Sequence, residues 1–595
     1  MKQKIIDKKL SYKPNLQDYE QTYRDFSWSK AKKETEKFSG QIFNAACISV
    51  DVNAKNCRKN KIALYWEGEN EEEFKFTFQE ISLLSNRVGN CLKNLGVKKG
   101  DRVFIFLPRL PELYFSFLGI LKIGAIAGTL FSAFGPQALE DRLQNSDAKI
   151  LITSEELYPR VQKILKKISS LKKIILIDEW NRTNFMEEKP LEMRKSADKC
   201  LWFYSLLVKA SPSLKPCNMQ EDDPAFMLYT SGTTGKPKGV IHRHQAIVHQ
   251  IKSAEFVLDI KENDVYWCTA DPGWVTGIAY EILGTWALGA STLVFSGRFE
   301  PEKWYRLIEE YKVTVWYTAP TAIRMLAAAG LDIVRKHDLS SLRHLCSVGE
   351  PLNPEAVYWG LKAFGLAFHD NFWQTETGGI VIANYPSLKI KPGSMGKPIP
   401  GIVAQVIDEK GIKMKPGNEG NLALKPGWPG MMLKIWRRPE KYESYFLTEA
   451  GSTKKKWYIT GDRAFQDKDG YFWFVGRQDD VIKTAGERVG PFEVESALVS
   501  HPKIAEAGVI GKPDPVRGEI IKAFISLKPG VKPSKSLEED IKTYVKKHLA
   551  GHAYPREIEF IDKLPKTRSG KIVRRLLKAK ELGLPLGDTS TLEDF

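Results

Sequence analysis

Short apolar runs alternate with amphipathic patterns between about residues 60 and 350. The apolar runs have the length and composition of strands: RVFIFLP at 102–108, KILIT at 149–153, KIILID at 173–178, AFMLYT at 225–230 and TLVFS at 292–296. Strands that alternate with helices in this way form a mostly parallel sheet covered by helices on both faces. We therefore predict an α/β fold, in which ligands bind where loops leave the carboxyl ends of the strands.

The most apolar stretch runs from Tyr114 to Gly135 and is interrupted by one charge, Lys122. Its length would suit a membrane span. However, Pro111 and Glu112 precede it, and three glycines divide it, at 119, 124 and 128. We predict a buried helix at about 112–122 followed by a buried strand, and no association with a membrane.

The pattern of residue types changes twice toward the C-terminus. Between about 386 and 475 Pro and Gly are frequent and short strands are separated by turns, with hairpin tips expected at Lys410-Gly411 and Asp469-Gly470. This indicates a small antiparallel β subdomain within a large N-terminal domain of residues 1–477. After GRQDD, a predicted helix over ERVGPFEVESALVSHP, two strands and a second helix indicate a small mobile α+β domain at 478–595.

Composition excludes some classes of protein but does not identify the function. The 595 residues include 43% hydrophobic and 11% aromatic side chains, which is typical of a protein with a large core. The net charge of +17 could indicate nucleic-acid binding, but the lysines are spread along the chain and suit a solvated surface that also accepts polyanions. Seven cysteines form no CxxC pair, and no signal-peptide core is present near the N-terminus, so we expect a cytoplasmic protein without disulfides or zinc.

The strongest local signal is YTSGTTGKPKG, residues 229–239, at the end of a predicted strand. Its glycines allow the backbone to turn sharply and present N–H groups to an anion, and its hydroxyls and lysines add donors and charge. The glycines are too close together for a Walker A loop, and Pro237 follows Lys236. We predict phosphate binding by Thr230, Ser231, Gly232, Thr233, Thr234, Gly235, Lys236 and Lys238.

This loop resembles the nucleotide loop of the adenylate-forming superfamily, which contains acyl-CoA synthetases, luciferases and peptide-synthetase adenylation domains. Further segments resemble AMP-forming acetyl-CoA synthetases, in the order expected for that family: ADPGWVTG (270–277), SVGEPLNPE (347–355), DNFWQTETGG (370–379), YITGD (458–462), GRQDDVIKTAGERVGPFEVESAL (476–498) and LPKTRSGK (564–571). The resemblance covers residues 15–590. It implies an enzyme that activates a short carboxylic acid with ATP and transfers the acyl group to coenzyme A.

The resemblance implies which residues form the nucleotide site. The GEP and DNFWQT segments would surround AMP, with Gly349, Glu350, Pro351, Asp370, Asn371, Phe372, Trp373, Gln374 and Thr375. Asp462 matches the carboxylate that binds the ribose hydroxyls, and Arg477 matches a nucleotide-contacting arginine. Glu376 would be a hard oxygen ligand for the Mg²⁺ that accompanies ATP.

The C-terminal domain would supply residues to both half-reactions. Lys571 matches the lysine that brings carboxylate and α-phosphate together, and its acetylation is a regulatory hypothesis because acetylation removes the charge. A domain swing about Asp479 would then replace it with the loop that contains Gly486, which would lie beside the coenzyme A thiol. Ala485, Arg488 and Lys546 are the expected coenzyme A contacts. Val499 and His501 match positions linked to a metal in relatives, although a structural role suits a His beside a helix end.

The resemblance also implies which acid is used. Trp373 matches the tryptophan that forms the floor of the carboxylate pocket in acetyl-CoA synthetases. The remaining wall of the pocket would consist of Val275, Thr276 and Val348. A rigid indole excludes longer chains by steric clash. Three positions depart from the family pattern: Phe372, Ile278 and Ala485 replace a tryptophan, a histidine and a serine.

Three alternatives stay open at this point. The enzyme could prefer propionate or another short acid, which the dependence of pyrophosphate–ATP exchange on chain length would reveal. It could be an adenylation module that serves a carrier protein, which thioester formation with free coenzyme A would decide. A nucleic-acid-binding protein would show salt-sensitive retention on DNA.

Overall fold

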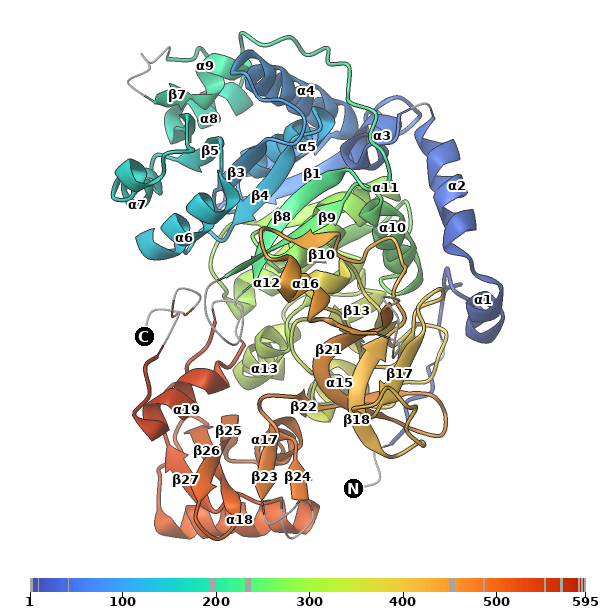
Figure 1. The fold of residues 1–595 in the computed structure, drawn as a ribbon, viewed down its shortest axis with the longest axis vertical. Coiled ribbons are helices and arrows are strands. Elements are labelled where there is room, and N and C mark those ends of the chain that lie inside the picture. The colour runs from blue at the N-terminus through green and yellow to red at the C-terminus, as the bar shows by residue number, and fades with distance from the viewer. Residues whose placement is uncertain are drawn as a thin grey trace.

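Four β-sheets and the helices between them make up the chain in a computed structural model (Figure 1). The structure describes residues 4–8, 10–40, 42–192, 199–230, 237–448, 455–484, 487–549, 553–567, 571–586, 589 and 592. Figure 1 shows α17–α19 and β23–β27 gathered at one end of the molecule, opposite the end formed by β7, α8 and α9.

The first sheet has eight strands in the order β19-β9-β8-β4-β3-β5-β6-β7. Their bounds in that order are Lys434–Ile435, Lys238–Arg243, Pro224–Thr230, Ile126–Leu130, Arg102–Phe106, Ile150–Ser154, Lys173–Ile177 and Cys200–Trp202. The strands from β8 to β7 are parallel, as predicted. The pair β8–β9 is antiparallel, so the strands on either side of residues 231–236 are hydrogen-bonded neighbours.

The second sheet has nine strands in the order β16-β15-β14-β13-β12-β10-β11-β1-β2. Their bounds in that order are Lys397–Pro398, Ile382–Ala383, Phe368–Phe372, His344–Ser347, Val315–Thr318, Val265–Cys268, Ser291–Phe295, Ile62–Glu67 and Glu73–Thr77. The strands from β14 to β1 are parallel, and the pairings at both edges are antiparallel. The carboxyl ends of β12, β13 and β14 therefore meet at one edge of the sheet.

Helices cover these two sheets. The longer ones are α1 (Tyr19–Asp25), α2 (Trp28–Ser39), α4 (Phe78–Asn94), α5 (Pro111–Lys122), α6 (Pro136–Ser146), α8 (Glu179–Met186), α10 (Ala246–Phe256), α12 (Pro301–Glu310), α13 (Pro320–Ala329) and α15 (Pro354–Phe364). Shorter turns are η1 (Cys47–Asp51), α3 (Val52–Ala54), α7 (Tyr158–Gln162), η2 (Leu165–Lys167), α9 (Phe203–Leu207), η3 (Gly277–Leu283), α11 (Gly284–Ala287), α14 (Leu331–Val334), η4 (Thr375–Thr377) and α16 (Pro439–Glu443).

The apolar stretch that begins near Pro111 forms α5 and β4, which confirms the predicted buried helix and strand. Every residue of α5 is buried, and Pro111 occupies its first turn, where a missing N–H costs nothing. Its terminal Lys122 is paired with Asp51 at 2.6 Å and also donates to Ser85. No helix within the described ranges is long and apolar enough to cross a membrane.

The third sheet is antiparallel and confirms the predicted β subdomain. It contains β17 (Ala404–Ile407), β18 (Glu419–Leu424), β20 (Phe446–Thr448), β21 (Lys455–Gln466) and β22 (Phe472–Arg477). Gly470 lies at the tip of the β21–β22 hairpin with φ +84°, and Gly411 turns the chain after β17 with φ +81°. Both turns lie where the sequence predicts them, because glycine adopts positive φ without steric cost.

The fourth sheet belongs to the C-terminal part. It contains β23 (Ile482–Thr484), β24 (Glu487–Val489), β25 (Ile504–Asp514), β26 (Gly518–Leu527) and β27 (Glu557–Phe560), together with α17 (Pro491–Val499), α18 (Lys535–His548) and α19 (Arg574–Leu582). The helix predicted to start at Glu487 starts at Pro491, because Glu487–Val489 pairs with β23 as a strand.

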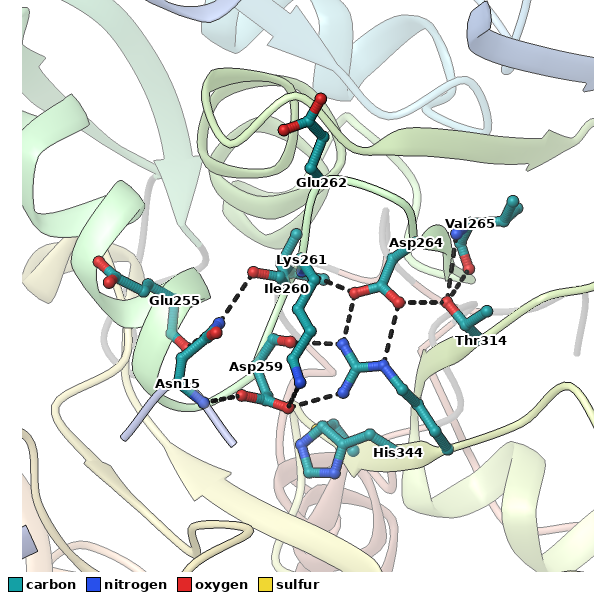
Figure 2. Close-up of polar contacts among 12 residues, drawn as sticks. Asn15, Glu255, Asp259, Ile260, Lys261, Glu262, Asp264, Val265, Thr314 and His344 are labelled. Carbon is teal, nitrogen blue, oxygen red and sulfur yellow. Dashed lines mark hydrogen bonds and ion pairs between the residues drawn. The ribbon is translucent and has the colours of Figure 1, made fainter. Parts of the chain in front are cut away.

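A buried ion cluster ties the N-terminal segment to the second sheet (Figure 2). Arg343, just before β13, donates to Asp259 at 2.6 Å and through its Nε to Asp264 at 3.0 Å. The backbone N–H of Asn15 donates to the other oxygen of Asp259 at 2.6 Å. Burial raises the pKa of Asp259, and Asn15 and Arg343 act against that rise.

We expect Arg343→Ala to destabilise the protein by about 3–5 kcal/mol, because it leaves two buried carboxylates without their shared cation. Thermal or urea unfolding measures the change. Arg335→Ala is the matched control: Arg335 makes an exposed i,i+3 pair with Asp332, which contributes less than about 1 kcal/mol. Equal losses in the two variants would contradict this role of the cluster.

Candidate active site

The predicted nucleotide segments leave two neighbouring parallel strands. Gly349, Glu350 and Pro351 follow β13, and the residues from Trp373 onward follow β14. Gly349 has φ +96°, a conformation that a side chain would strain, so the glycine allows the chain to turn directly after the strand. The structure thus brings the two segments side by side at the edge where ligands bind in α/β sheets.

Asp370 connects these two segments through a hydrogen bond. It is buried in β14, and its carboxylate accepts a hydrogen bond from the backbone N–H of Leu352 at 3.3 Å. Burial raises its pKa well above the usual range. This position suits a role in shaping the site.

Gln374 connects the second sheet to the antiparallel sheet. Its amide nitrogen donates to Asp462 at 2.7 Å and to the backbone oxygen of Thr460 at 2.9 Å, and its oxygen accepts from the Tyr458 hydroxyl at 2.8 Å. Both ends of the amide are engaged, so Gln374 fixes the Asp462 carboxylate beside the segment that follows β14.

Asp462 is a buried carboxylate with a cation beside it. Arg477 lies 3.5 Å away and also 3.6 Å from Asp479, the predicted hinge residue, which is exposed. Burial raises the pKa of Asp462 to about 6, and the charges of Arg477 and Lys571 oppose the rise. The group is therefore ionised at neutral pH and able to accept hydrogen bonds from hydroxyl groups.

Glu376 is held by a tyrosine that the sequence did not reveal. The Tyr445 hydroxyl donates to Glu376 at 2.9 Å and accepts from the Lys238 ammonium at 2.6 Å. Lys238 itself lies 4.0 Å from Glu376 and over the Tyr445 ring. A carboxylate and an ammonium from two different sheets are thus fixed next to each other, in a form suited to phosphate and its counter-ion.

Lys571, from the C-terminal part, lies close to charged groups of the other sheets. Burial and Arg477 lower its pKa, while Asp462 and Glu350 act in the opposite direction. The residue as a whole still has exposed surface, and its backbone N–H donates to Thr567 at 3.1 Å within a hairpin. The structure therefore brings together Lys571, Asp462, Arg477 and Glu350, which are up to 221 positions apart in the sequence.

Arg324 is a second residue that motif reasoning missed. It lies on α13, donates to Glu350 at 3.1 Å and donates to Thr321 at 2.7 Å. Thr321 in turn donates to Glu350 at 2.9 Å. The segment YTAPTAIR, which runs from the last two residues of β12 into α13, could have signalled it, because polar residues that follow a parallel strand face the same edge as the other site segments.

Trp373 lies where two hydrophobic clusters of the core meet. One cluster contains Val275 and the other contains Val348, both nearly buried, and Thr276 lies at the start of η3. The indole stays half-buried, whereas Ile278, the departure from the family pattern in η3, is fully buried. The predicted pocket residues thus come from the ends of β13 and β14 and from η3.

Several predicted residues lie outside what the structure describes. They are Ser231, Gly232, Thr233, Thr234, Gly235, Lys236, Ala485, Gly486 and the side chain of Arg488. Thr230 ends β8, and its hydroxyl has no hydrogen-bond partner among the described residues. Lys238 begins β9, so the two described ends of the loop are adjacent in the sheet.

The remaining predicted residues lie on the C-terminal part. Lys546 is exposed on α18 with its ammonium over the Tyr554 ring. Val499 ends α17, and His501 is buried, with its Nδ1 near the Lys503 N–H and its Nε2 3.4 Å from Asp540. Both ring nitrogens of His501 are occupied, so a metal at this position would need other atoms. The described residues contain no group of three or more His, Cys, Asp or Glu placed to hold a metal ion.

The chain matches known protein families over most of its length. Residues 50–436 match the family described as AMP-binding enzyme, and residues 493–571 match the AMP-binding enzyme C-terminal domain. The chain is 53% identical to the acetyl-coenzyme A synthetase of Bacillus subtilis (strain 168), over 98% of each chain. It is 44% identical to that of Methanothrix thermoacetophila, over 93% of this chain and 85% of the relative.

Solved structures share the fold. A crystal structure of an anthranilate CoA ligase in complex with anthranoyl-AMP has a TM-score of 0.80 at 32% identity, covering 91% of this chain and 98% of the other. A Brucella canis acyl-CoA synthetase has a TM-score of 0.71 at 34% identity, covering 96% and 99%. These matches confirm the family resemblance and the predicted α/β fold class.

Proposed function

Because this chain belongs to the family of AMP-binding enzymes, we propose that it ligates acetate to coenzyme A in two steps. Acetate and ATP form acetyl-AMP and pyrophosphate, and coenzyme A then converts acetyl-AMP to acetyl-CoA and AMP. The observation that carries the proposal is that Lys571, on the C-terminal sheet and helix unit, lies close enough to Asp462 and Glu350 for their charges to oppose the lowering of its pKa by burial. The near full-length similarity to proteins named acetyl-coenzyme A synthetase supports the choice of acid.

In the first step a carboxylate oxygen of acetate attacks the α-phosphorus of ATP. The bond from this phosphorus to the bridging oxygen breaks, and pyrophosphate leaves with that oxygen and its electron pair. Two anions approach each other, so the reaction needs positive charge placed between them. Lys571 supplies this charge, Asp462 accepts hydrogen bonds from the ribose hydroxyls, and Arg477 balances the carboxylate.

Mg²⁺ fits the oxygen chemistry around Glu376. A hard carboxylate at a phosphate site commonly provides one protein ligand to Mg²⁺, and substrate phosphates and water provide the rest. The ion would neutralise charge on the phosphates. Tyr445 and Lys238 orient the Glu376 carboxylate through the hydrogen bond at 2.9 Å and the ammonium at 4.0 Å.

In the second step the coenzyme A thiol, as its thiolate, attacks the acetyl carbonyl carbon. The carbon–oxygen bond to AMP breaks, and AMP leaves with the oxygen. We infer that residues 478–595 swing about Asp479 between the steps, withdraw Lys571 and bring the segment around Gly486 to the thiol. Ala485, Arg488 and Lys546 are the proposed coenzyme A contacts, and Asp479 suits a hinge because it is exposed in the turn between β22 and β23.

Two further proposals follow from the same site. The enzyme acts in the cytoplasm, where its substrates ATP and coenzyme A are available. Acetylation of Lys571 would remove the charge that the first step needs and would leave the second step intact. Quantifying both half-reactions on protein acetylated at Lys571 tests this, and equal inhibition of both would refute it.

The raised pKa of Asp462 predicts how ATP binding depends on pH. Above about pH 7 the carboxylate accepts two hydroxyl donors, and as the pH falls through about 6 protonation removes this capacity. At pH 5, one unit below the pKa, only about a tenth is ionised, so KM for ATP should rise about tenfold. Initial rates at saturating acetate between pH 5 and 8 measure this.

Asp462→Asn is the control for the pH profile. The amide does not titrate, so its KM for ATP should be raised but nearly constant between pH 5 and 8. An inflection near pH 6 that persists in this variant would assign the titration to another group.

Product analysis tests the proposed reaction as a whole. With acetate, ATP and free coenzyme A, we expect equal amounts of acetyl-CoA, AMP and pyrophosphate. Formation of ADP and phosphate would contradict the proposal. Adenylation without thioester formation on free coenzyme A would favour a carrier-protein module instead.

A further inference from the structure

The hydroxyl of Tyr317 lies between Trp373 and Asn371. Tyr317 is on β12, at the carboxyl end of the strand, and is fully buried. The indole N–H of Trp373 donates to its hydroxyl oxygen at 3.3 Å, and the hydroxyl lies 2.7 Å from the Asn371 side-chain oxygen. One side chain thus joins a residue of the predicted nucleotide segment to the residue predicted to close the acid pocket.

The chemistry of the three groups fixes the direction of these hydrogen bonds. An indole N–H can only donate, so the Tyr317 oxygen accepts from Trp373. The proton of the hydroxyl is then available to Asn371, whose oxygen must face Tyr317. Burial raises the pKa of Tyr317 well above its usual range, so the hydroxyl keeps its proton at every working pH.

Tyr280 supports the indole from another side. It is fully buried in η3, and its ring meets the Trp373 ring edge-on, with centroids 5.2 Å apart and an angle of 83°. The Tyr280 hydroxyl accepts from the backbone N–H of Ile380 at 2.7 Å, so this ring is fixed at both ends. The indole therefore rests on two buried tyrosines, and only its N–H contact with Tyr317 is a directional bond.

We propose that Tyr317 is a positioning residue that sets the longest acid the enzyme accepts, by holding the Trp373 indole across the end of the acid pocket. This inference rests on the proposed function and assigns to Tyr317 a role beyond core packing. The contact to Trp373, at 3.3 Å, is the longer of the two hydrogen bonds, so its loss frees the indole at a small cost in stability.

Tyr317→Phe keeps the ring and removes the hydroxyl, together with its hydrogen bonds to Trp373 and Asn371. The double-mutant cycle with Trp373→Gly then separates the effect of the Trp373 contact. We expect the ratio of kcat/KM for butyrate over that for acetate to rise about three- to tenfold, the range that loss of one neutral hydrogen bond produces. Tyr305→Phe is the matched control, because Tyr305 is equally buried on α12 and its hydroxyl has no partner among the described residues. Its ratio should stay within about twofold of the wild type.

A double-mutant cycle shows whether Tyr317 acts through Trp373. When Trp373→Gly has removed the indole, adding Tyr317→Phe should change the butyrate-to-acetate ratio by less than about twofold. A similar rise in both backgrounds would show that Tyr317 acts elsewhere and would overturn the proposal. So would an unchanged ratio in the single variant when thermal unfolding shows that it is folded.

The remaining outcomes are also decisive. If Tyr317→Phe is too unstable to assay, Tyr280→Leu removes the edge-on ring and should raise the same ratio; an unchanged ratio contradicts the proposed support of the indole. A wild-type protein that activates no short acid refutes the proposed function itself. A wild type that activates acetate with a sharp length limit, together with unchanged variants, refutes only the role of Tyr317.

Discussion

Replacement of Lys571 by alanine is expected to reduce acetyl-AMP formation about a thousandfold, the upper range for loss of one charged group that stabilises a transition state. The physical reason is that Lys571 lies close enough to Asp462 and Glu350 for their charges to oppose the lowering of its pKa by burial, and we propose that its ammonium meets both incoming anions there. Thioester formation from supplied acetyl-AMP should stay within about twofold of the wild type, because a proposed domain swing removes Lys571 before that step.

Lys580→Ala is the matched control for this experiment. Lys580 is an exposed lysine in α19 of the same unit, and its replacement should leave both half-reactions unchanged. Each half-reaction is measured separately, by pyrophosphate release without coenzyme A and by acetyl-CoA formation from acetyl-AMP. Loss of both half-reactions in Lys571→Ala would contradict the proposal that each half-reaction uses a different conformation.

Replacement of Trp373 by glycine should move the preferred acid from acetate to chains of four or more carbons. Each methylene that enters an apolar pocket contributes about 1–3 kcal/mol, so two or three added methylenes should raise relative kcat/KM for the longer acids about a hundredfold or more. The half-buried indole lies where the clusters with Val275 and Val348 meet, so its removal leaves apolar space for the longer chain.

The acid profile is best measured as pyrophosphate–ATP exchange with acids from acetate to hexanoate. Trp202→Gly is a suitable control, because it removes a partly buried indole from β7, the edge strand of the first sheet. It should lower stability without changing the profile. An unchanged profile in Trp373→Gly would show that another residue sets the limit, and a wild type with peak activity at six or more carbons would end the assignment to acetate.

Much of the fold could be predicted because local pattern and tertiary structure agree. The apolar runs near 102, 150, 174, 226 and 292 became β3, β5, β6, β8 and β11, and the glycine turns near 411 and 470 lie as expected. The helix predicted to start at Glu487 starts at Pro491 instead. Glu487–Val489 has a helical pattern, but pairing with β23 determines its conformation.

Only the site residues that stand in short sequence motifs could be predicted. Glu376, Asp462 and Lys571 stand in recognisable segments, whereas Tyr445, Arg324 and Tyr317 are defined by contacts between distant parts of the chain. Tyr445, for example, meets Glu376 from 69 positions away and Lys238 from 207 positions away. No local pattern in a single sequence records the contacts of Tyr445, because they form where the antiparallel sheet meets the other two sheets.

We propose that Lys238, Asp462 and Lys571 together join an acid to AMP. Acetate-dependent exchange of labelled pyrophosphate into ATP, with Mg²⁺ and without coenzyme A, tests this most directly. We expect exchange that requires acetate and is lost in Lys571→Ala. Absence of exchange in folded wild-type protein, or exchange of equal rate without any acid, would contradict it.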